Sequence, residues 1–206
     1  MLIVLENFLD VKSDLYKEVT ADSFWTQENI PRNTWVDKNE TAKDAWSALC
    51  HKIWRHMKEV LPREFEGFEY WANEITENSD LGWHQDKDEF KYHFADPQEN
   101  VPPYLGAIYY AHTEKPDGGY LEIRRVDEPP YEVGEHPDFI SEDPDQYERI
   151  QPVPNRLVIF DSGMWHRVSR VHSGKRRYLA TNVWIDKPME ENFHPEGFDL
   201  SKYEDA

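Results

Sequence analysis

The pair His84 and Asp86, separated only by Gln85, could supply two ligands to a metal ion. If this segment is a strand, both side chains lie on one face, because residues two apart in a strand point the same way. A further histidine from a distant strand would complete a set of two imidazoles and one carboxylate. Such a set leaves three positions of an octahedral ion open, which suits a metal that must also bind a substrate and O2.

His-x-Asp is a short pattern, and the chain contains it twice. The second copy, His136-Pro137-Asp138, lies in a proline-rich stretch, and Pro137 argues against a regular strand there. His84 and Asp86 lie in a segment with β character, and further strand-like segments follow it. They are therefore the better candidates, although Asp86 could also serve only as a turn carboxylate.

The segment Leu157–Ile185 contains the other residues of chemical interest. Its apolar start, two Ser-Gly turns and alternating end predict strand, turn, strand, turn, strand. His166 stands at the start of the second of these strands, and the pair Arg176-Arg177 at the start of the third. His166 could instead be a half-buried histidine that only makes hydrogen bonds within the protein.

The elements around these residues are expected to be helical first and β later. We expect a strand at 2–5, helices at 12–19 and 41–60, and strands at 68–75, 82–86, 104–111 and 120–124. Residues 87–103 are expected to be irregular, 126–155 to form a long surface insertion or lid, and 187–206 an irregular tail. The pattern predicts an α+β fold in a single domain, residues 1–206, with an antiparallel sandwich or barrel as its functional core.

The order of these motifs resembles the double-stranded β-helix core, a cupin-like jelly roll, of the Fe(II)/2-oxoglutarate-dependent dioxygenases. The nearest likeness is to the prolyl 4-hydroxylase-like branch, which the opening LIVLENFLD also resembles. The resemblance covers about residues 1–20 and 65–186, and the N-terminal helices fit the support helices of that fold. The motifs that carry it are His84-Gln85-Asp86, YLGAIYYA at 104–111, Gly118-Gly119, NRLVIFDSGMWH ending in His166, and Gly174-Lys175-Arg176.

The resemblance implies a role for each matching residue. His84, Asp86 and His166 would be the Fe(II) ligands. Arg176, ten residues after His166, would bind the distal carboxylate of 2-oxoglutarate through its planar fork of donors. Tyr110 matches a position that often hydrogen-bonds the same carboxylate, although it could also be only a core aromatic residue.

The choice between Arg176 and Arg177 is open at the level of sequence. The family usually has a Trp about six residues after its Arg, whereas Trp184 stands eight residues after Arg176. Spacing from His166 and strand alternation favour Arg176, but a bulge would turn Arg177 inward instead. The tryptophans near the expected site, Trp83, Trp165 and Trp184, fit core positions better than a substrate platform.

The resemblance further implies hydroxylation of an unactivated C–H bond, with O2 as oxidant, succinate and CO2 as co-products, and ascorbate as a candidate reductant. A Gly or Ala in place of Asp86 would instead suggest halogenation. The branch suggests a prolyl residue in a peptide or protein as substrate, with a free amino acid or another small molecule as the alternative. The non-enzymatic alternative is a cupin-like binding module.

The composition restricts the partners. The formal net charge of -18 repels phosphate backbones, so a nucleic-acid substrate is disfavoured. Segments 87–103 and 127–154, which we expect to form the substrate mouth, both carry acidic residues, so a cationic or neutral partner is favoured over an anionic one. No apolar run approaches the roughly 20 residues needed to span a bilayer. The N-terminus does not read as a signal peptide, and the single Cys50 fits a reducing compartment, so we expect a cytoplasmic protein.

Overall fold

The computed structural model describes residues 1–125 and 143–189. The longer helices are α1 (Asp14–Thr20), α2 (Ala45–His56) and α3 (Glu89–Phe94), and short 3-10 helices lie at 22–24, 58–60 and 144–146. The strands are β1 (Leu2–Leu5), β2 (Thr34–Asp37), β3 (Gly67–Ile75), β4 (Leu81–His84), β5 (Leu105–Tyr110), β6 (Asp117–Gly118), β7 (Leu121–Arg124), β8 (Tyr147–Ile150), β9 (Leu157–Phe160), β10 (His166–Val168), β11 (Val171–Ser173) and β12 (Arg176–Trp184).

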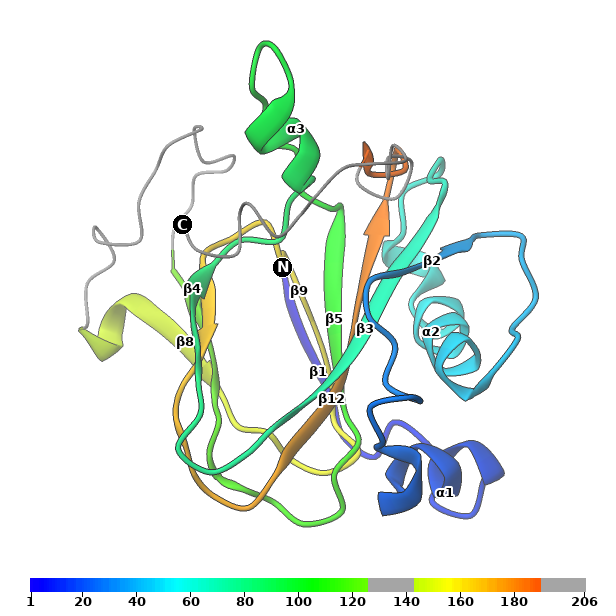
Figure 1. Ribbon diagram of the computed structural model, residues 1–206, viewed down its shortest axis with the longest axis vertical. Coiled ribbons are helices and arrows are strands. Elements are labelled where there is room, and N and C mark those ends of the chain that lie inside the picture. The colour runs from blue at the N-terminus through cyan, green and yellow to red at the C-terminus, as the bar shows by residue number, and fades with distance from the viewer. Residues whose placement is uncertain (126–142, 190–206) are drawn as a thin grey trace.

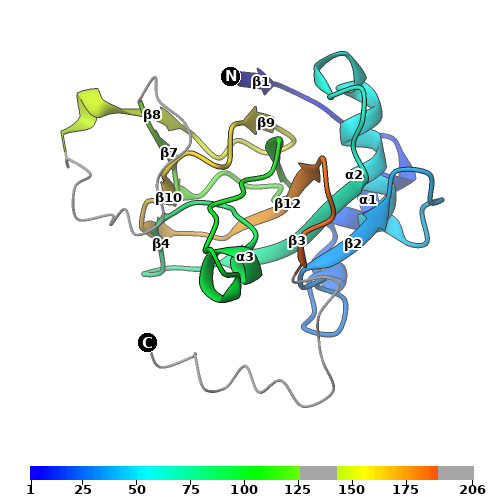
Figure 2. The same ribbon diagram turned by 90° about the horizontal axis from the view of Figure 1, so that it is seen from above.

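Two antiparallel sheets face each other and form the body of the protein (Figures 1 and 2). Within the described residues, the larger sheet has the order β1-β9-β5-β12-β3-β2, and the smaller has the order β4-β10-β7-β8. A separate short ladder pairs β11 with β6. Apart from the pairs β2–β3 and β7–β8, neighbouring strands in these two sheets are not consecutive in the sequence, as in a jelly roll. The predicted α+β class with a jelly-roll core is therefore confirmed.

Helices α1 and α2 cover the outer face of the larger sheet (Figure 2). Helix α2 begins at Ala45 rather than at 41 because Asp44 caps it: the Asp44 carboxylate accepts from Ser47 N–H at 2.7 Å, and the Ser47 hydroxyl accepts from Asp44 N–H at 3.0 Å. The predicted helix 41–60 is thus too long at its start, and its last residues, 58–60, form a separate 3-10 turn.

Strand β12 lies in the middle of the larger sheet, between β3 and β5. Residues Leu179 and Val183 pack into the apolar core beneath α2, while Tyr178 and Ala180 pack into a second core between the two sheets. Every residue of β12 is buried, so its alternating side chains connect the helical layer with the interior of the jelly roll.

Two predicted segments differ from the structure near the expected site. The strand predicted for 82–86 ends at His84, so Asp86 lies beyond it, in the connection to α3. Residues 87–103 are not wholly irregular, because α3 forms within them. Its start is capped by the buried Asp88, whose carboxylate accepts from Lys91 N–H at 2.9 Å.

The segment predicted as an insertion, 126–155, contains a strand in its described part. Its part Tyr147–Ile150 forms β8, which pairs with β7 at the edge of the smaller sheet. Residues 126–142 lie outside the described residues, as do His136, Asp138 and most of the predicted tail. No helix in the described part of the chain is long and apolar enough to cross a membrane.

Asn155 joins the N-terminal segment to the larger sheet. Its side-chain oxygen accepts from Leu9 N–H and from the Tyr109 hydroxyl, each at 2.9 Å, and its amide donates to the Leu9 carbonyl at 2.8 Å. Asn155 is buried and has a φ of 58°, a backbone conformation that Asn tolerates better than most residues. Its removal would leave the buried Tyr109 hydroxyl and Leu9 amide without these partners.

We predict that Asn155→Ala lowers the free energy of unfolding by about 3 kcal/mol, because three buried hydrogen bonds are lost and a positive φ is retained. Asn78→Ala is the matched control: Asn78 has a φ of 66° but is exposed, and its side chain makes no hydrogen bond within the described residues. That control should lose about 1 kcal/mol. Urea denaturation measures both, and equal losses would show that the Asn155 side-chain bonds do not stabilise the fold.

Candidate metal centre and carboxylate pocket

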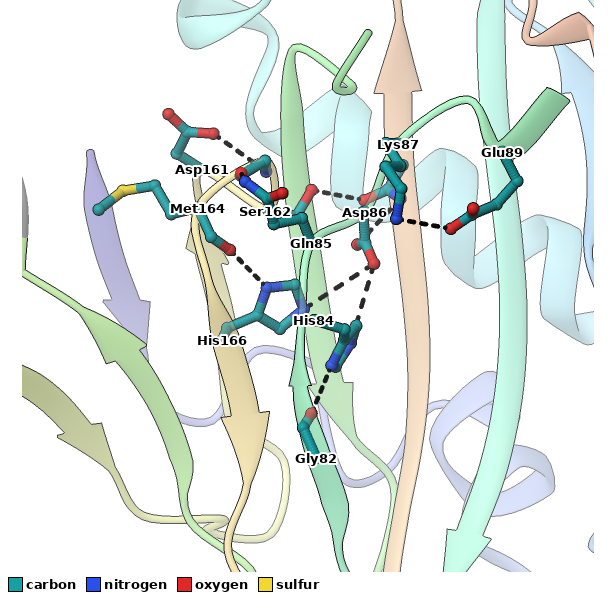
Figure 3. Close-up of polar contacts among 12 residues, drawn as sticks. Gly82, His84, Gln85, Asp86, Lys87, Glu89, Asp161, Ser162, Met164 and His166 are labelled. Atoms are coloured by element: carbon teal, nitrogen blue, oxygen red, sulfur yellow. Dashed lines mark hydrogen bonds and ion pairs between the residues drawn. The ribbon is translucent and has the colours of Figure 1, made fainter. Parts of the chain in front are cut away.

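The structure brings His84, Asp86 and His166 together. His84 ends β4 and His166 begins β10, and the two residues pair directly across the antiparallel ladder. The ligand atoms of the three residues all lie within 4.8 Å of one another. Asp86 Oδ1 is 4.0 Å from His84 Nε2 and 3.8 Å from His166 Nε2, and all three side chains point toward a common centre (Figure 3).

Backbone carbonyls select the tautomer of both histidines. His84 Nδ1 lies 2.8 Å from the Gly82 carbonyl, and His166 Nδ1 lies 2.8 Å from the Met164 carbonyl (Figure 3). A carbonyl can only accept, so each Nδ1 carries the proton. Each Nε2 then presents a lone pair to the centre, as metal-binding histidines do.

The surroundings keep His166 neutral. Burial, together with the neighbouring His84, lowers the pKa of His166 to about 4, and the Asp86 carboxylate only partly offsets this. A histidine must be unprotonated to bind a metal, so His166 is ready for this role at neutral pH. These donors, two imidazole nitrogens and one carboxylate oxygen, fit Fe(II) and leave coordination positions open.

Arg176 lies in the same cavity as the three residues, at the start of β12. It is fully buried, and its Nε donates to the Gly119 carbonyl at 3.0 Å. Its guanidinium carbon lies 5.1 Å from the centre of the Tyr110 ring and 4.4 Å from that of Tyr178. Within the described residues, Nη1 and Nη2 have no hydrogen-bond partner. A buried cation with two unused donors is costly unless an anion binds it, and a carboxylate matches its geometry.

Two neighbours add to this anion pocket. The Tyr110 hydroxyl is buried and has no hydrogen-bond partner within the described part of the chain, so it is a further donor whose hydrogen bond is not used. Gly119 has a φ of 67°, and a Cβ there would lie 3.1 Å from Arg176 Cδ. The Gly-Gly turn therefore lets the backbone approach Arg176 closely.

Arg177 points to the other face of the larger sheet. Its Nε lies 2.6 Å from a Glu74 carboxylate oxygen, and its Nη1 lies 2.5 Å from an Asp22 carboxylate oxygen. Arg177 thus attaches the segment that precedes β2 to the sheet. The strand contains no bulge that would turn Arg177 inward, because β12 pairs with β3 in continuous register.

Sequence reasoning did not single out Asn182 or Ser162. Asn182 Nδ2 donates to Asp86 Oδ2 at 3.1 Å, and the backbone N–H of Asp86 donates to the Ser162 carbonyl at 2.9 Å. Strand alternation from Arg176 could have indicated Asn182, because both face the cavity. No comparable signal marks Ser162, which lies in the turn between β9 and β10.

The remaining candidates lie outside this cavity. The indole of Trp83 packs beneath the Arg167 guanidinium at 4.6 Å, and the indole N–H of Trp184 donates to Glu69 at 3.1 Å. Trp165 is buried in a small apolar cluster with Met164. Burial raises the pKa of the Cys50 thiol to about 12, so Cys50 is a core residue and not a nucleophile.

Solved structures share the fold at low sequence identity. A Pseudomonas putida prolyl-4-hydroxylase has 18% identity and a TM-score of 0.57, over 89% of this chain and 84% of that chain. HygX from Streptomyces hygroscopicus, solved with nickel, 2-oxoglutarate and hygromycin B, has 13% identity and a TM-score of 0.53, over 89% and 82%. A Trichoplax adhaerens prolyl hydroxylase in complex with a hypoxia inducible factor peptide fragment has 14% identity and a TM-score of 0.51, over 94% and 87%.

At these identities the structural likeness establishes the fold alone, and no curated protein sequence matches the chain. The family itself is established by a sequence model, that of the 2OG-Fe(II) oxygenase superfamily, which matches residues 70–186. This range is more than half of the chain and contains the three clustered residues as well as Tyr110 and Arg176. The chain therefore belongs to the 2OG-Fe(II) oxygenase superfamily, with Fe(II) and 2-oxoglutarate as its cofactors and dioxygenase chemistry as its activity.

Proposed function

We propose that this chain is a 2-oxoglutarate-dependent hydroxylase in which His84, Asp86 and His166 bind Fe(II) and Arg176 binds 2-oxoglutarate. The observation that carries the proposal is that the three clustered side chains and the Arg176 guanidinium line one cavity. Tyr110 adds a hydrogen bond to the same distal carboxylate. A binding module with a structural metal would fit this site poorly, because such sites are usually closed by four protein ligands.

Each residue contributes a separate physical effect. His84 and His166 present neutral nitrogens, and Asp86 adds the one negative charge of the ligand set. Arg176 neutralises and orients the distal carboxylate of 2-oxoglutarate, so that the other end of the co-substrate faces the metal site. The apolar walls around Ile108, Leu121 and Phe160 exclude water from this part of the cavity. When bound, Fe(II) couples O2 to the decarboxylation of 2-oxoglutarate and to hydroxylation of a substrate C–H bond.

The substrate that we propose is a prolyl residue in a peptide or protein. The support is the resemblance to the prolyl 4-hydroxylase-like branch together with the structural likeness to prolyl hydroxylases from Pseudomonas putida and Trichoplax adhaerens. A free amino acid or another small molecule is the second candidate, since HygX shares the fold and was solved with hygromycin B bound. In either case, the net charge of -18 favours a neutral or cationic substrate.

The enzymatic proposal predicts slow formation of succinate from 2-oxoglutarate when Fe(II), O2 and ascorbate are present and no substrate is added. A neutral or basic proline-containing peptide should accelerate succinate formation and gain one oxygen atom by mass spectrometry. Acceleration by small molecules but not by such peptides would favour the second candidate. No succinate, together with no thermal shift on addition of 2-oxoglutarate, would contradict the enzymatic proposal.

The ligand assignment predicts that His84→Ala and His166→Ala each weaken Mn(II) binding, measured by titration calorimetry, by more than about 100-fold. Each variant removes one of the three donors, and alanine cannot replace it. His172→Ala is the control, because His172 is exposed on β11 and should leave the affinity unchanged. Wild-type Mn(II) affinity in both ligand variants would show that the set is wrong.

The choice of arginine predicts opposite effects for two adjacent substitutions. Arg176→Ala should raise the 2-oxoglutarate concentration needed for half-maximal turnover about 100-fold, because two charged hydrogen bonds are lost. Arg177→Ala should leave that concentration nearly unchanged but lower the melting temperature, because the contacts with Glu74 and Asp22 are lost. The reverse pattern would assign the co-substrate to Arg177.

A further inference from the structure

We infer that Asn182 and Ser162 form a positioning relay that lets the Asp86 carboxylate offer only one oxygen, Oδ1, to the metal. The inference rests on the proposed assignment of His84, Asp86 and His166 as ligands. Neither Asn182 nor Ser162 would touch the metal, so both act through Asp86.

Asp86 needs such support because it is not part of a strand. Strand β4 ends at His84, and the ladder between β4 and β10 therefore positions both histidines but not the carboxylate. The Asp86 backbone is held by its N–H bond to the Ser162 carbonyl at 2.9 Å. That bond does not determine the rotation of the carboxylate about its own axis.

The relay determines this rotation. The Ser162 hydroxyl donates to Asn182 Oδ1 at 3.0 Å, and Asn182 Nδ2 donates to Asp86 Oδ2 at 3.1 Å. The opposite amide orientation would place Asn182 Oδ1 against the Asp86 carboxylate, two acceptors facing each other. With Oδ2 occupied by the amide, Oδ1 is left to face the two histidine Nε2 atoms at 4.0 and 3.8 Å.

Both side chains of the relay are buried. The exposed fractions of Ser162 and Asn182 are 0% and 2%, so water does not compete for their hydrogen bonds. Gly106 on β5 provides the space: a Cβ at this position would lie 2.6 Å from the Ser162 hydroxyl oxygen and 2.8 Å from Asn182 Oδ1. Any side chain at 106 would therefore displace the relay.

A single carboxylate oxygen matters for the proposed reaction. Two imidazoles and one carboxylate oxygen leave three positions of an octahedral ion open. If Asp86 rotated and bound through both oxygens, one of these positions would be filled. The relay thus preserves room for 2-oxoglutarate, which would chelate the metal through two atoms, and for O2.

The test compares neighbouring residues on opposite faces of β12. Asn182→Ala should raise the Kd for Mn(II), measured by titration calorimetry, about 10- to 100-fold, the range typical for residues that orient a ligand. Ser162→Ala should raise the Kd for Mn(II) by a smaller factor, because the Asn182 amide remains and loses only the hydroxyl that orients it. Thr181→Val should leave it unchanged and lower the melting temperature, because the Thr181 hydroxyl accepts from the Trp54 indole N–H at 3.0 Å beneath α2.

A spectroscopic readout separates positioning from general destabilisation. The visible absorption of bound Co(II) reports its coordination number, so it should change in Asn182→Ala and not in Thr181→Val. Wild-type Mn(II) affinity and an unchanged Co(II) spectrum in Asn182→Ala would overturn the inference. If Asn182→Ala does not fold, Ser162→Ala decides the question by the same two measurements, because it retains every backbone bond.

Asp86→Ala distinguishes failure of the proposed ligand set from failure of the proposed relay. If it abolishes Mn(II) binding while Asn182→Ala and Ser162→Ala bind Mn(II) as the wild type does, the ligand set stands and the relay is wrong. If Asp86→Ala itself retains the wild-type Kd for Mn(II), the proposed ligand set is wrong, and the inferred role of the relay is wrong as well.

Discussion

The site depends on one constraint, the burial of β12 on both of its faces. Because side chains in a strand alternate, every odd-numbered residue from Arg177 to Val183 points away from the cavity, and every even-numbered residue points toward the interior of the jelly roll. Residues Leu179 and Val183 attach the strand to the helical layer. This attachment positions Arg176 and Asn182 on the opposite face of the strand, where they line the cavity. A shift of register by one residue would exchange the two sets and destroy the pocket.

A second pairing, between β4 and β10, brings the two histidines together. Their direct opposition in an antiparallel ladder gives a ring separation of 4.2 Å, and backbone carbonyls two residues before each one set the tautomers. The geometry of the imidazoles is therefore determined by main-chain hydrogen bonds. The carboxylate is different, because Asp86 lies in a connection. Its orientation depends on side chains from β12 and from the turn after β9, so the three donors are held by two separate mechanisms.

Within the described residues, several polar groups in the site are buried without the hydrogen bonds or charge partners that would stabilise the fold. Arg176 is buried with two donors unused in the described part of the structure, and the Tyr110 hydroxyl beside it is also unsatisfied. Burial holds His166 in its neutral form, next to a carboxylate that would otherwise favour the protonated form. Each feature costs stability in the absence of ligands and, under the proposed function, becomes favourable when a metal and a dicarboxylate bind. Arg177, one residue away, shows the opposite case: its charge is paired with Glu74 and Asp22, which is what a structural arginine does.

The sequence by itself determined the types and the order of the elements that matter, because these depend on local periodicity. In the structure, the side chains of β12 alternate between the two cores, and the apolar stripe of α2 is buried, as predicted. His166 and Arg176 line the same cavity, as their spacing suggested. Only the tertiary structure decided three points. First, β4 ends at His84, so Asp86 lies outside the strand and contacts Asn182 and Ser162 instead. Second, the tertiary structure turned 147–150 into β8, because a strand at the edge of the smaller sheet completes the hydrogen bonds of β7. Finally, the tertiary structure placed Arg176 toward the cavity and Arg177 away from it. The sheets packed around a strand decide which of its faces meets the cavity, and the pattern of the strand itself does not.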